Sequence, residues 1–285
     1  MKKSTLKVLF ILAIMIAVSY YSFYLTHTSK ITLNQIITNV LKGSKGEYSI
    51  AIKNLKTGEE YSINSHKTYK TGSLYKLWIM STAYEKIQEG TISEDESLTG
   101  DIETLNNKFD IDPEFRELTD GTINFTVSSA LRQMITISHN YAALILTERI
   151  GLSNIKTFLE KHGFVESSVG GSFPVSNPND IALFLEKLYK GELSTPENTK
   201  KMLELLKKQE LNDKLPKYLP SGTVVAHKTG EIDFLTHDAG IVYTKNGDYI
   251  IVVFSESNNP AGAEDRIAQI SKAVYDYFMS SKNSS

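Results

Sequence analysis

Strand patterns near both ends of the chain enclose a long helical segment, and this order limits the possible folds more than any other feature. Patterns typical of strands cover Tyr48–Lys53, Glu60–Ile63, Thr223–His227, Ala239–Thr244 and Tyr249–Ser255. Between the two groups, from residue 73 to about residue 208, the apolar residues follow helical spacing. One antiparallel sheet interrupted by a helical insertion accommodates this order. We therefore predict an α+β fold with its main cleft between the sheet and the helical part.

Amphipathic helices are predicted on either side of this arrangement, over Ile31–Leu41 and Glu264–Phe278. We expect an antiparallel five-stranded sheet with flanking N- and C-terminal helices, interrupted by an all-helical subdomain. The α/β part takes residues 31–66 and 222–279, and the helical part takes residues 67–221. A short polar tail, residues 280–285, follows.

The first 30 residues are predicted to be a targeting element outside the fold. Lys2, Lys3 and Lys7 precede an apolar run of 18 residues, Val8–Leu25. Basic residues before an apolar stretch hold the start on the cytoplasmic side, so that the rest of the chain is exported. The run is at the low end of the length for a spanning helix, but it continues through Tyr20, Tyr21, Phe23 and Tyr24, aromatic residues typical of a membrane interface, so we favour an uncleaved membrane anchor. The alternative is a signal peptide cleaved near Ala17-Val18-Ser19. Either case predicts an extracytoplasmic protein.

The composition excludes several classes of function. There is no cysteine, which removes thiol catalysis and cysteine-based zinc sites. Lys and Arg number 31 against 33 Asp and Glu, so the chain lacks the basic surface of a nucleic-acid-binding protein. The six histidines show no H-E-x-x-H pairing. We expect no metal, no cofactor and no nucleic-acid partner, and we expect a monomer.

A candidate nucleophile lies in the unit Ser73-Leu74-Tyr75-Lys76, where the first long helix of the helical segment begins. Residues three apart share a face of a helix, so that the hydroxyl and the amine meet. The start of a helix also offers free N–H groups and a positive dipole end to a developing alkoxide. A desolvated lysine beside other cations loses its proton and acts as a base. Further Ser-x-x-Lys matches at Ser4–Lys7 and Ser153–Lys156 are interpreted as coincidence.

The tripeptide Lys-Thr-Gly occurs three times, at Lys56–Gly58, Lys70–Gly72 and Lys228–Gly230. We interpret the first as a hairpin turn and the second as the approach to the Ser73 helix. The third ends the predicted strand Thr223–His227, where it can present a cation and a hydroxyl to an anionic ligand. Gly230 would let the backbone come close to that ligand.

The order of these motifs resembles a known family. Ser73-x-x-Lys76 is followed about 65 residues later by Ser138-His139-Asn140, and about 90 residues further on by Lys228-Thr229-Gly230. This series is similar to that of class A β-lactamases and penicillin-binding proteins. The resemblance extends from about Ile31 to Phe278 and includes Leu118-Thr119-Asp120-Gly121.

The resemblance implies catalytic roles for four positions. Ser73 would be acylated by the substrate carbonyl, and Lys76 would be its base or proton relay. Ser138 would pass a proton to the leaving nitrogen and contact the ligand carboxylate. The backbone N–H groups of Ser73 and Glu231 would form the oxyanion hole.

The resemblance also implies substrate-binding positions. Asn140 would bind the amide side chain of the substrate and orient Lys76. Lys228, Thr229 and Gly230 would hold the ligand carboxylate. His237 begins the strand expected to pair beside them, at a place where many relatives carry an arginine, and it is either a carboxylate-binding group or an ordinary residue at a strand end.

Two departures from the family pattern bear on function. His139 replaces the usual aspartate, and we interpret it as part of the loop scaffold. The Glu-x-x-Leu-Asn motif, whose glutamate activates the deacylating water in class A β-lactamases, is missing from residues 163–180. Glu166 is interpreted as a solvated charge, and Asp180 as a residue that begins the helix before Ile181.

The chain is therefore expected to be acylated readily but deacylated slowly. That profile favours a D,D-peptidase-like enzyme or a slow β-lactam hydrolase, with a β-lactam or a peptidoglycan stem peptide as its partner. A genuine β-lactamase with a different deacylating group, or a non-hydrolytic sensor of β-lactams or cell wall, is the alternative.

Overall fold

The computed structural model describes residue 15 and residues 32–280 of the chain. The predicted anchor or signal peptide lies outside these residues except for Met15, and so does most of the polar tail. In the part of the chain that the structure describes, no helix combines the length and the apolar character needed to cross a membrane.

The main sheet has five antiparallel strands in the order β2-β1-β9-β8-β7. Its strands are β1 (Glu47–Asn54), β2 (Glu60–Ile63), β7 (Val225–Ile232), β8 (Leu235–Val242) and β9 (Tyr249–Glu256). The central strand β9 is buried along seven of its eight residues, from Tyr249 to Ser255. A strand that is apolar on both faces requires cover on both sides of the sheet.

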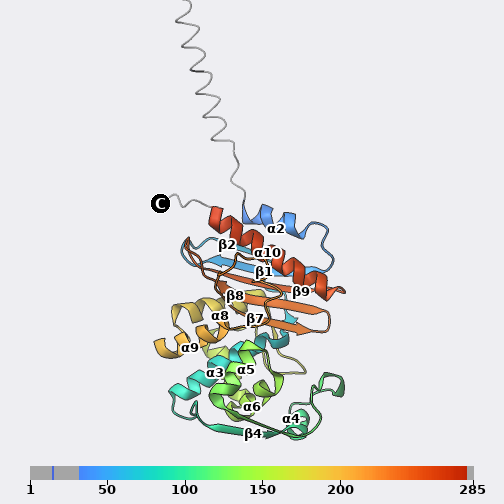
Figure 1. The fold of residues 1–285 in the computed structure, drawn as a ribbon, viewed down its shortest axis with the longest axis vertical. Helices are drawn as coiled ribbons and strands as arrows, with labels where there is room; N and C mark the ends of the chain where they lie inside the picture. Colours follow the sequence, from blue (N-terminus) through green and yellow to red (C-terminus); the bar gives the residue numbers. More distant parts are fainter. Residues whose placement is uncertain (1–14, 16–31, 281–285) are drawn as a thin grey trace, which may run out of the picture.

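Helices supply that cover and build the rest of the molecule. They are α2 (Leu33–Leu41), α3 (Lys76–Gln88), α4 (Ile102–Lys108), α5 (Val127–Thr136), α6 (Asn140–Ile150), α7 (Leu152–His162), α8 (Pro178–Lys190), α9 (Pro196–Lys207) and α10 (Pro260–Ser280), with 3-10 turns η1 (Gly72–Tyr75) and η2 (Pro113–Phe115). Helices α2 and α10 pack together on one face of the sheet (Figure 1), where Ile37 and Ile267 belong to one buried cluster with Ile251 of β9. Helix α8 packs on the other face, against β1, β8 and β9.

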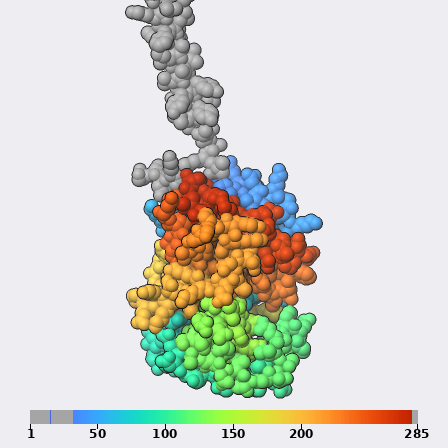
Figure 2. Space-filling view, viewed as in Figure 1, coloured from blue at the N-terminus to red at the C-terminus, as the bar shows by residue number. Residues whose placement is uncertain are grey.

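The helical part lies at the opposite end from α2 and α10, and Figure 2 shows its green segments gathered there. Its core surrounds α3, whose residues from Lys76 to Tyr84 are all buried. Two short strand pairs brace this part: β4 (Ser97–Asp101) pairs with β5 (Thr122–Thr126), and β3 (Tyr69–Lys70) pairs with β6 (Val175–Ser176). The β3–β6 pair ties the segment before Ser73 to the loop that precedes α8.

The α+β class, the five-stranded antiparallel sheet and the flanking helices are confirmed. Helix α6 has the predicted bounds, and α2 begins at Leu33 because Thr32 caps it through a reciprocal bond pair with Gln35. The prediction that Lys228-Thr229-Gly230 follows the end of a strand was wrong, since β7 continues through these residues to Ile232. Strand β8 likewise begins at Leu235, four residues before the predicted start at Ala239.

Candidate active site

Ser73 lies in η1, pressed against strand β7 by two glycines. Gly72 has a positive φ of 50°, and a Cβ there would lie 2.4 Å from the backbone nitrogen of Glu231. A Cβ on Gly230 would lie 2.3 Å from the carbonyl oxygen of Thr71. Only glycine permits this contact between backbones. It brings the N–H of Glu231 to the segment that carries Ser73, as the predicted oxyanion hole requires.

Lys76 is the first residue of α3, one turn after Ser73, and its side chain is fully buried. Its Nζ lies 2.6 Å from the carbonyl oxygen of Ser138, 3.2 Å from the Ser138 hydroxyl and 2.5 Å from Oδ1 of Asn140. The Ser138 carbonyl and the Asn140 amide oxygen can each accept one N–H. A neutral amine donates two such bonds and keeps its lone pair for a proton.

Ser138 connects the two lysines of the site. Lys228 Nζ donates to the Ser138 hydroxyl at 2.9 Å, and Lys76 Nζ lies 3.2 Å from the same oxygen. Ser138 has a φ of 60°, a left-handed conformation that a residue with a Cβ seldom adopts. Such strain persists where the surrounding structure imposes it and is concentrated at functional sites. It places the hydroxyl at the junction of α5, α6 and β7.

Burial determines the charge state of both lysines. Burial lowers the pKa of the Lys76 amine well below its usual value, the charge of Lys228 lowers it further, and Glu117 opposes the shift. Burial also lowers the pKa of Lys228 to about 7, against the opposing charges of Asp238 and Glu231. Paired buried cations with perturbed pKa values are typical of catalytic sites. The arrangement can supply a neutral amine as base beside a cation that binds an anion.

Asn140 completes the predicted group from the first residue of α6. Its Oδ1 accepts from Lys76, and its Nδ2 donates to Oε1 of Glu117 at 2.6 Å. The sequence did not single out Glu117, which belongs to a loop and follows no periodic pattern. The adjoining string Leu118-Thr119-Asp120-Gly121 was the only signal near it.

Thr229 and Gly230 lie within β7 beside Lys228, as the motif requires, but the ring of His237 is enclosed in the core. In the register of β7 and β8, Thr229 is paired with Asp238, whereas His237 is paired with Gly230. His237 is fully buried, with Nε2 3.0 Å from the carbonyl oxygen of Lys70 and Nδ1 3.3 Å from the backbone nitrogen of Ser255. Both ring nitrogens are engaged, so the geometry favours the reading of His237 as an ordinary strand residue over a carboxylate-binding one.

His139 occupies the N-cap of α6, and its Nδ1 accepts the backbone N–H of Ala142 at 3.2 Å. An aspartate at this position would form the same kind of bond with a carboxylate oxygen. The prediction that His139 is part of the loop scaffold agrees with this contact. The ring must stay unprotonated at Nδ1 to accept this bond. Burial lowers the pKa of His139 and so favours the neutral ring.

The two acids considered as water activators are Glu166, in the loop between α7 and α8, and Asp180, in the first turn of α8. Glu166 pairs with Nδ1 of His66 at 2.7 Å. Asp180 accepts the backbone N–H of Glu166 and the hydroxyl of Ser167, both at 2.9 Å. Asp180 is the third residue of α8 and not its cap, which is Asn177, so the prediction that Asp180 begins the helix was wrong.

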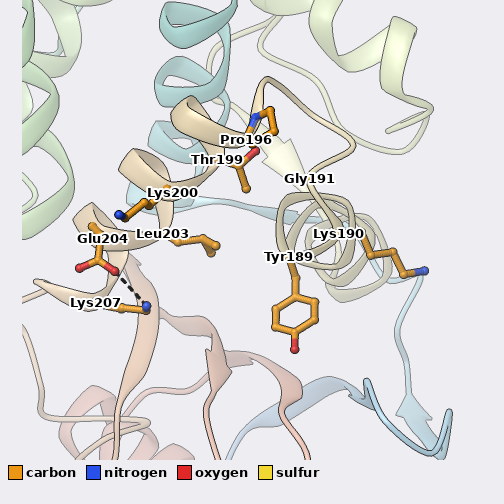
Figure 3. A pocket seen from close by; sticks show the side chains of 9 residues that line it. All are labelled: Tyr189, Lys190, Gly191, Pro196, Thr199, Lys200, Leu203, Glu204 and Lys207. Atoms are coloured by element: carbon orange, nitrogen blue, oxygen red, sulfur yellow. Dashed lines mark hydrogen bonds and ion pairs between the residues drawn. The ribbon is translucent and has the colours of Figure 1, made fainter.

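A concave region lies away from these residues, on the surface between α8 and α9 (Figure 3). Tyr189, Leu203 and Thr199 are among the residues that line it, and none of the predicted site residues does. Within residues 32–280, no group of histidines and acids is arranged to hold a metal ion.

Comparisons with known proteins agree with this geometry. The family model described as the beta-lactamase enzyme family matches residues 32–278. Beta-lactamase VEB-1 of Pseudomonas aeruginosa is 25% identical over 283 residues, which cover 88% of this chain and 91% of that protein.

Solved structures share the fold over nearly their whole length. A beta-lactamase from Sphaerobacter thermophilus superposes with a TM-score of 0.76 at 21% identity, covering 87% of this chain and 96% of its own. A mutant of PBP-A, solved as an acyl-enzyme complex with penicillin G, superposes with a TM-score of 0.75 at 24% identity and the same coverage of both chains.

Proposed function

We propose, on the premise that this chain belongs to the beta-lactamase enzyme family, that Ser73 is the nucleophile through which β-lactams or peptides ending in D-alanyl-D-alanine acylate it. The family membership makes the protein a serine hydrolase of the class A type.

The buried amine of Lys76 carries the proposal. It lies one turn from Ser73, its pKa is lowered by burial, and its N–H groups are directed to Ser138 and Asn140. Lys76 takes the proton of the Ser73 hydroxyl as the serine oxygen attacks the substrate carbonyl. The N–H groups of Ser73 and Glu231 hold the resulting oxyanion. The Ser138 hydroxyl then donates a proton to the leaving nitrogen, and the proton on Lys76 replaces it.

Release of the acyl group is proposed to be slow for β-lactams. Glu166 is bonded to His66 and Asp180 to Ser167, and among the described residues neither carboxylate is hydrogen-bonded to Ser73 or Lys76. The leaving group of a β-lactam stays attached to the acyl-enzyme and obstructs water, whereas the leaving residue of a linear peptide departs. This difference favours a D,D-peptidase-like activity on peptidoglycan stem peptides over rapid β-lactam hydrolysis.

We also propose that the enzyme acts outside the cytoplasm, held or exported by its N-terminal segment. The support is the basic start and the apolar run Val8–Leu25. Peptidoglycan substrates would require this location. Protease added to intact cells should digest the hydrolase domain, and a domain that is protected until the cells are lysed contradicts the location.

Intact-protein mass spectrometry with benzylpenicillin tests the function. We expect a stoichiometric adduct that persists for many minutes and is absent from the Ser73→Ala variant. Rapid turnover of a chromogenic cephalosporin would favour a genuine β-lactamase. A stable adduct on an enzyme that also fails to cleave a D-alanyl-D-alanine peptide would favour a sensor.

A further inference from the structure

The side chain of Asn140 has one hydrogen-bond donor left for a substrate. Its Oδ1 faces the Lys76 amine and its Nδ2 faces the carboxylate of Glu117, and this pair of partners fixes the orientation of the amide. An amide nitrogen carries two N–H donors. One is used by Glu117, so the second is available for the amide carbonyl of a ligand's acyl side chain.

The position of Glu117 is fixed by the residue that follows it. The carbonyl oxygen of Leu118 accepts from the Tyr141 hydroxyl at 2.6 Å and from Nδ2 of Asn106 at 2.9 Å. Tyr141 and Asn106 are both buried. Two consecutive loop residues, Glu117 and Leu118, therefore contact two consecutive residues of α6, Asn140 and Tyr141. This pairing holds the carboxylate at the amide-binding group.

Glu117 gives this part of the site a negative charge. Lys76 and Lys228 converge on Ser138, and Glu117 is the one carboxylate among the described residues that is bonded to Asn140. Its side chain is exposed, and only its Oε1 takes part in that bond, so Oε2 is left to solvent or ligand. A carboxylate next to the amide-binding donor attracts a cation attached near the substrate's amide and repels an anion.

We infer that Glu117 is a specificity-determining residue that favours substrates with an ammonium group in the acyl side chain, close to the amide that Asn140 binds. This inference rests on the proposed function, because it concerns the acyl group that Ser73 receives. It narrows the substrate class to amine-bearing acyl donors, such as stem peptides with a free side-chain amine or aminopenicillins.

Ampicillin and benzylpenicillin provide the test, because they differ by one ammonium group on the carbon beside the amide. The second-order rate constant of acylation is measured for both by rapid quench and intact-protein mass spectrometry. We expect Glu117→Gln to lower the ratio of the ampicillin to the benzylpenicillin rate constant about two- to fivefold, as for one exposed ion pair. Glu114→Gln is the matched control, since it removes an exposed carboxylate from the same loop without contacting Asn140, and its ratio should equal that of the wild type.

An unchanged ratio in Glu117→Gln overturns the inference, and so does an equal loss of acylation by both drugs, which would make Glu117 only a support for Asn140. Slower deacylation with an unchanged ratio also overturns it. The absence of any adduct on the wild-type protein would overturn the proposed function as well, whereas an adduct with an unchanged ratio overturns the inference alone.

Discussion

Two polar clusters border the segment that carries Ser73, and they differ in what their hydrogen bonds achieve. In the first, Lys76 of α3 and Lys228 of β7 both bond to the hydroxyl of Ser138 in the turn between α5 and α6, and Lys76 also bonds to Asn140 of α6. In the second, Glu166 of the loop before α8 is bonded to His66, and Asp180 in the first turn of α8 is bonded to Ser167 of that loop.

The energetic balance of the two clusters also differs. Burying two lysines beside each other is unfavourable, and their lowered pKa values express that cost. In the loop, His66 lowers the pKa of Glu166 by hydrogen bonding, which stabilises the ionised form. Burial raises the pKa of Asp180 in the same cluster, but the Ser167 hydroxyl and the Glu166 N–H stabilise its ionised form, and these bonds hold the loop to α8. The difference predicts that acylation is well supported and that deacylation is not.

Removing the buried amine should have the largest effect. Lys76→Met takes away the base, and we expect the acylation rate constant with benzylpenicillin to fall by about 10³-fold, within the usual range for general-base catalysis. Lys190→Met is the control, because its amine is half exposed and pairs with Glu186 on the surface. A fall of less than tenfold in Lys76→Met would contradict the assigned role.

The acylation rate should depend on pH in both directions. Below the lowered pKa of Lys76, the amine is protonated and cannot act as a base, so the rate constant falls toward acid. Above about pH 7, Lys228 loses the charge that binds the ligand carboxylate, so the rate constant falls again, by up to about tenfold per pH unit. Lys228→Arg keeps its charge and should lose the alkaline limb. A wild-type acylation rate constant that stays level from pH 7 to pH 9 would contradict the role assigned to charged Lys228 in binding the ligand carboxylate.

The cap of α6 should affect stability more than chemistry. His139→Ala removes the acceptor for the Ala142 N–H and should lower the free energy of unfolding by about 1 kcal/mol, whereas His139→Asn should preserve it. Because folding lowers the pKa of His139, the unfolded state binds its proton first as the pH falls. The wild-type protein should therefore lose stability below about pH 6.5, the ordinary value for histidine, more than His139→Asn does. Urea denaturation at pH 5 and pH 8 measures the free energy of unfolding of both proteins. An equal loss of stability in the wild type and in His139→Asn would contradict the role of the neutral His139 ring as the cap of α6.

The smallest effect is expected at the loop. Glu166→Gln should change the deacylation rate constant of the benzylpenicillin adduct by less than twofold, because the carboxylate is bonded to His66. A decrease of tenfold or more would show that the loop supplies the water-activating group and would remove the contrast between the two clusters.

Much of the fold was predictable from local patterns, and the exceptions have a common cause. Helix α6 was predicted with its bounds because Gly151 ends it and apolar residues occupy most of its length. Strand β7 was predicted too short because Lys-Thr-Gly-Glu has little strand propensity. Pairing with β8 over eight residues keeps it extended. Such a pairing is a tertiary effect that the local sequence does not express.

The candidate site was predictable where the order and spacing of the motifs along the chain indicated which residues belong together. The spacing of Ser73, Lys76, Ser138, Asn140 and Lys228 predicted a group whose last four members the structure joins by hydrogen bonds. The face of His237 was not predictable, since a shift of one residue in strand register reverses the face. Glu117 was missed because its contact with Asn140 spans 23 residues and depends on how a loop is held by Tyr141.

The time course of the benzylpenicillin adduct on intact wild-type protein, followed by mass spectrometry, tests the contrast between the two clusters most directly. The account predicts full labelling at Ser73 within the mixing period and an adduct that decays far more slowly than it forms. An adduct that decays as fast as it forms, or one that forms equally on Ser73→Ala, would contradict it.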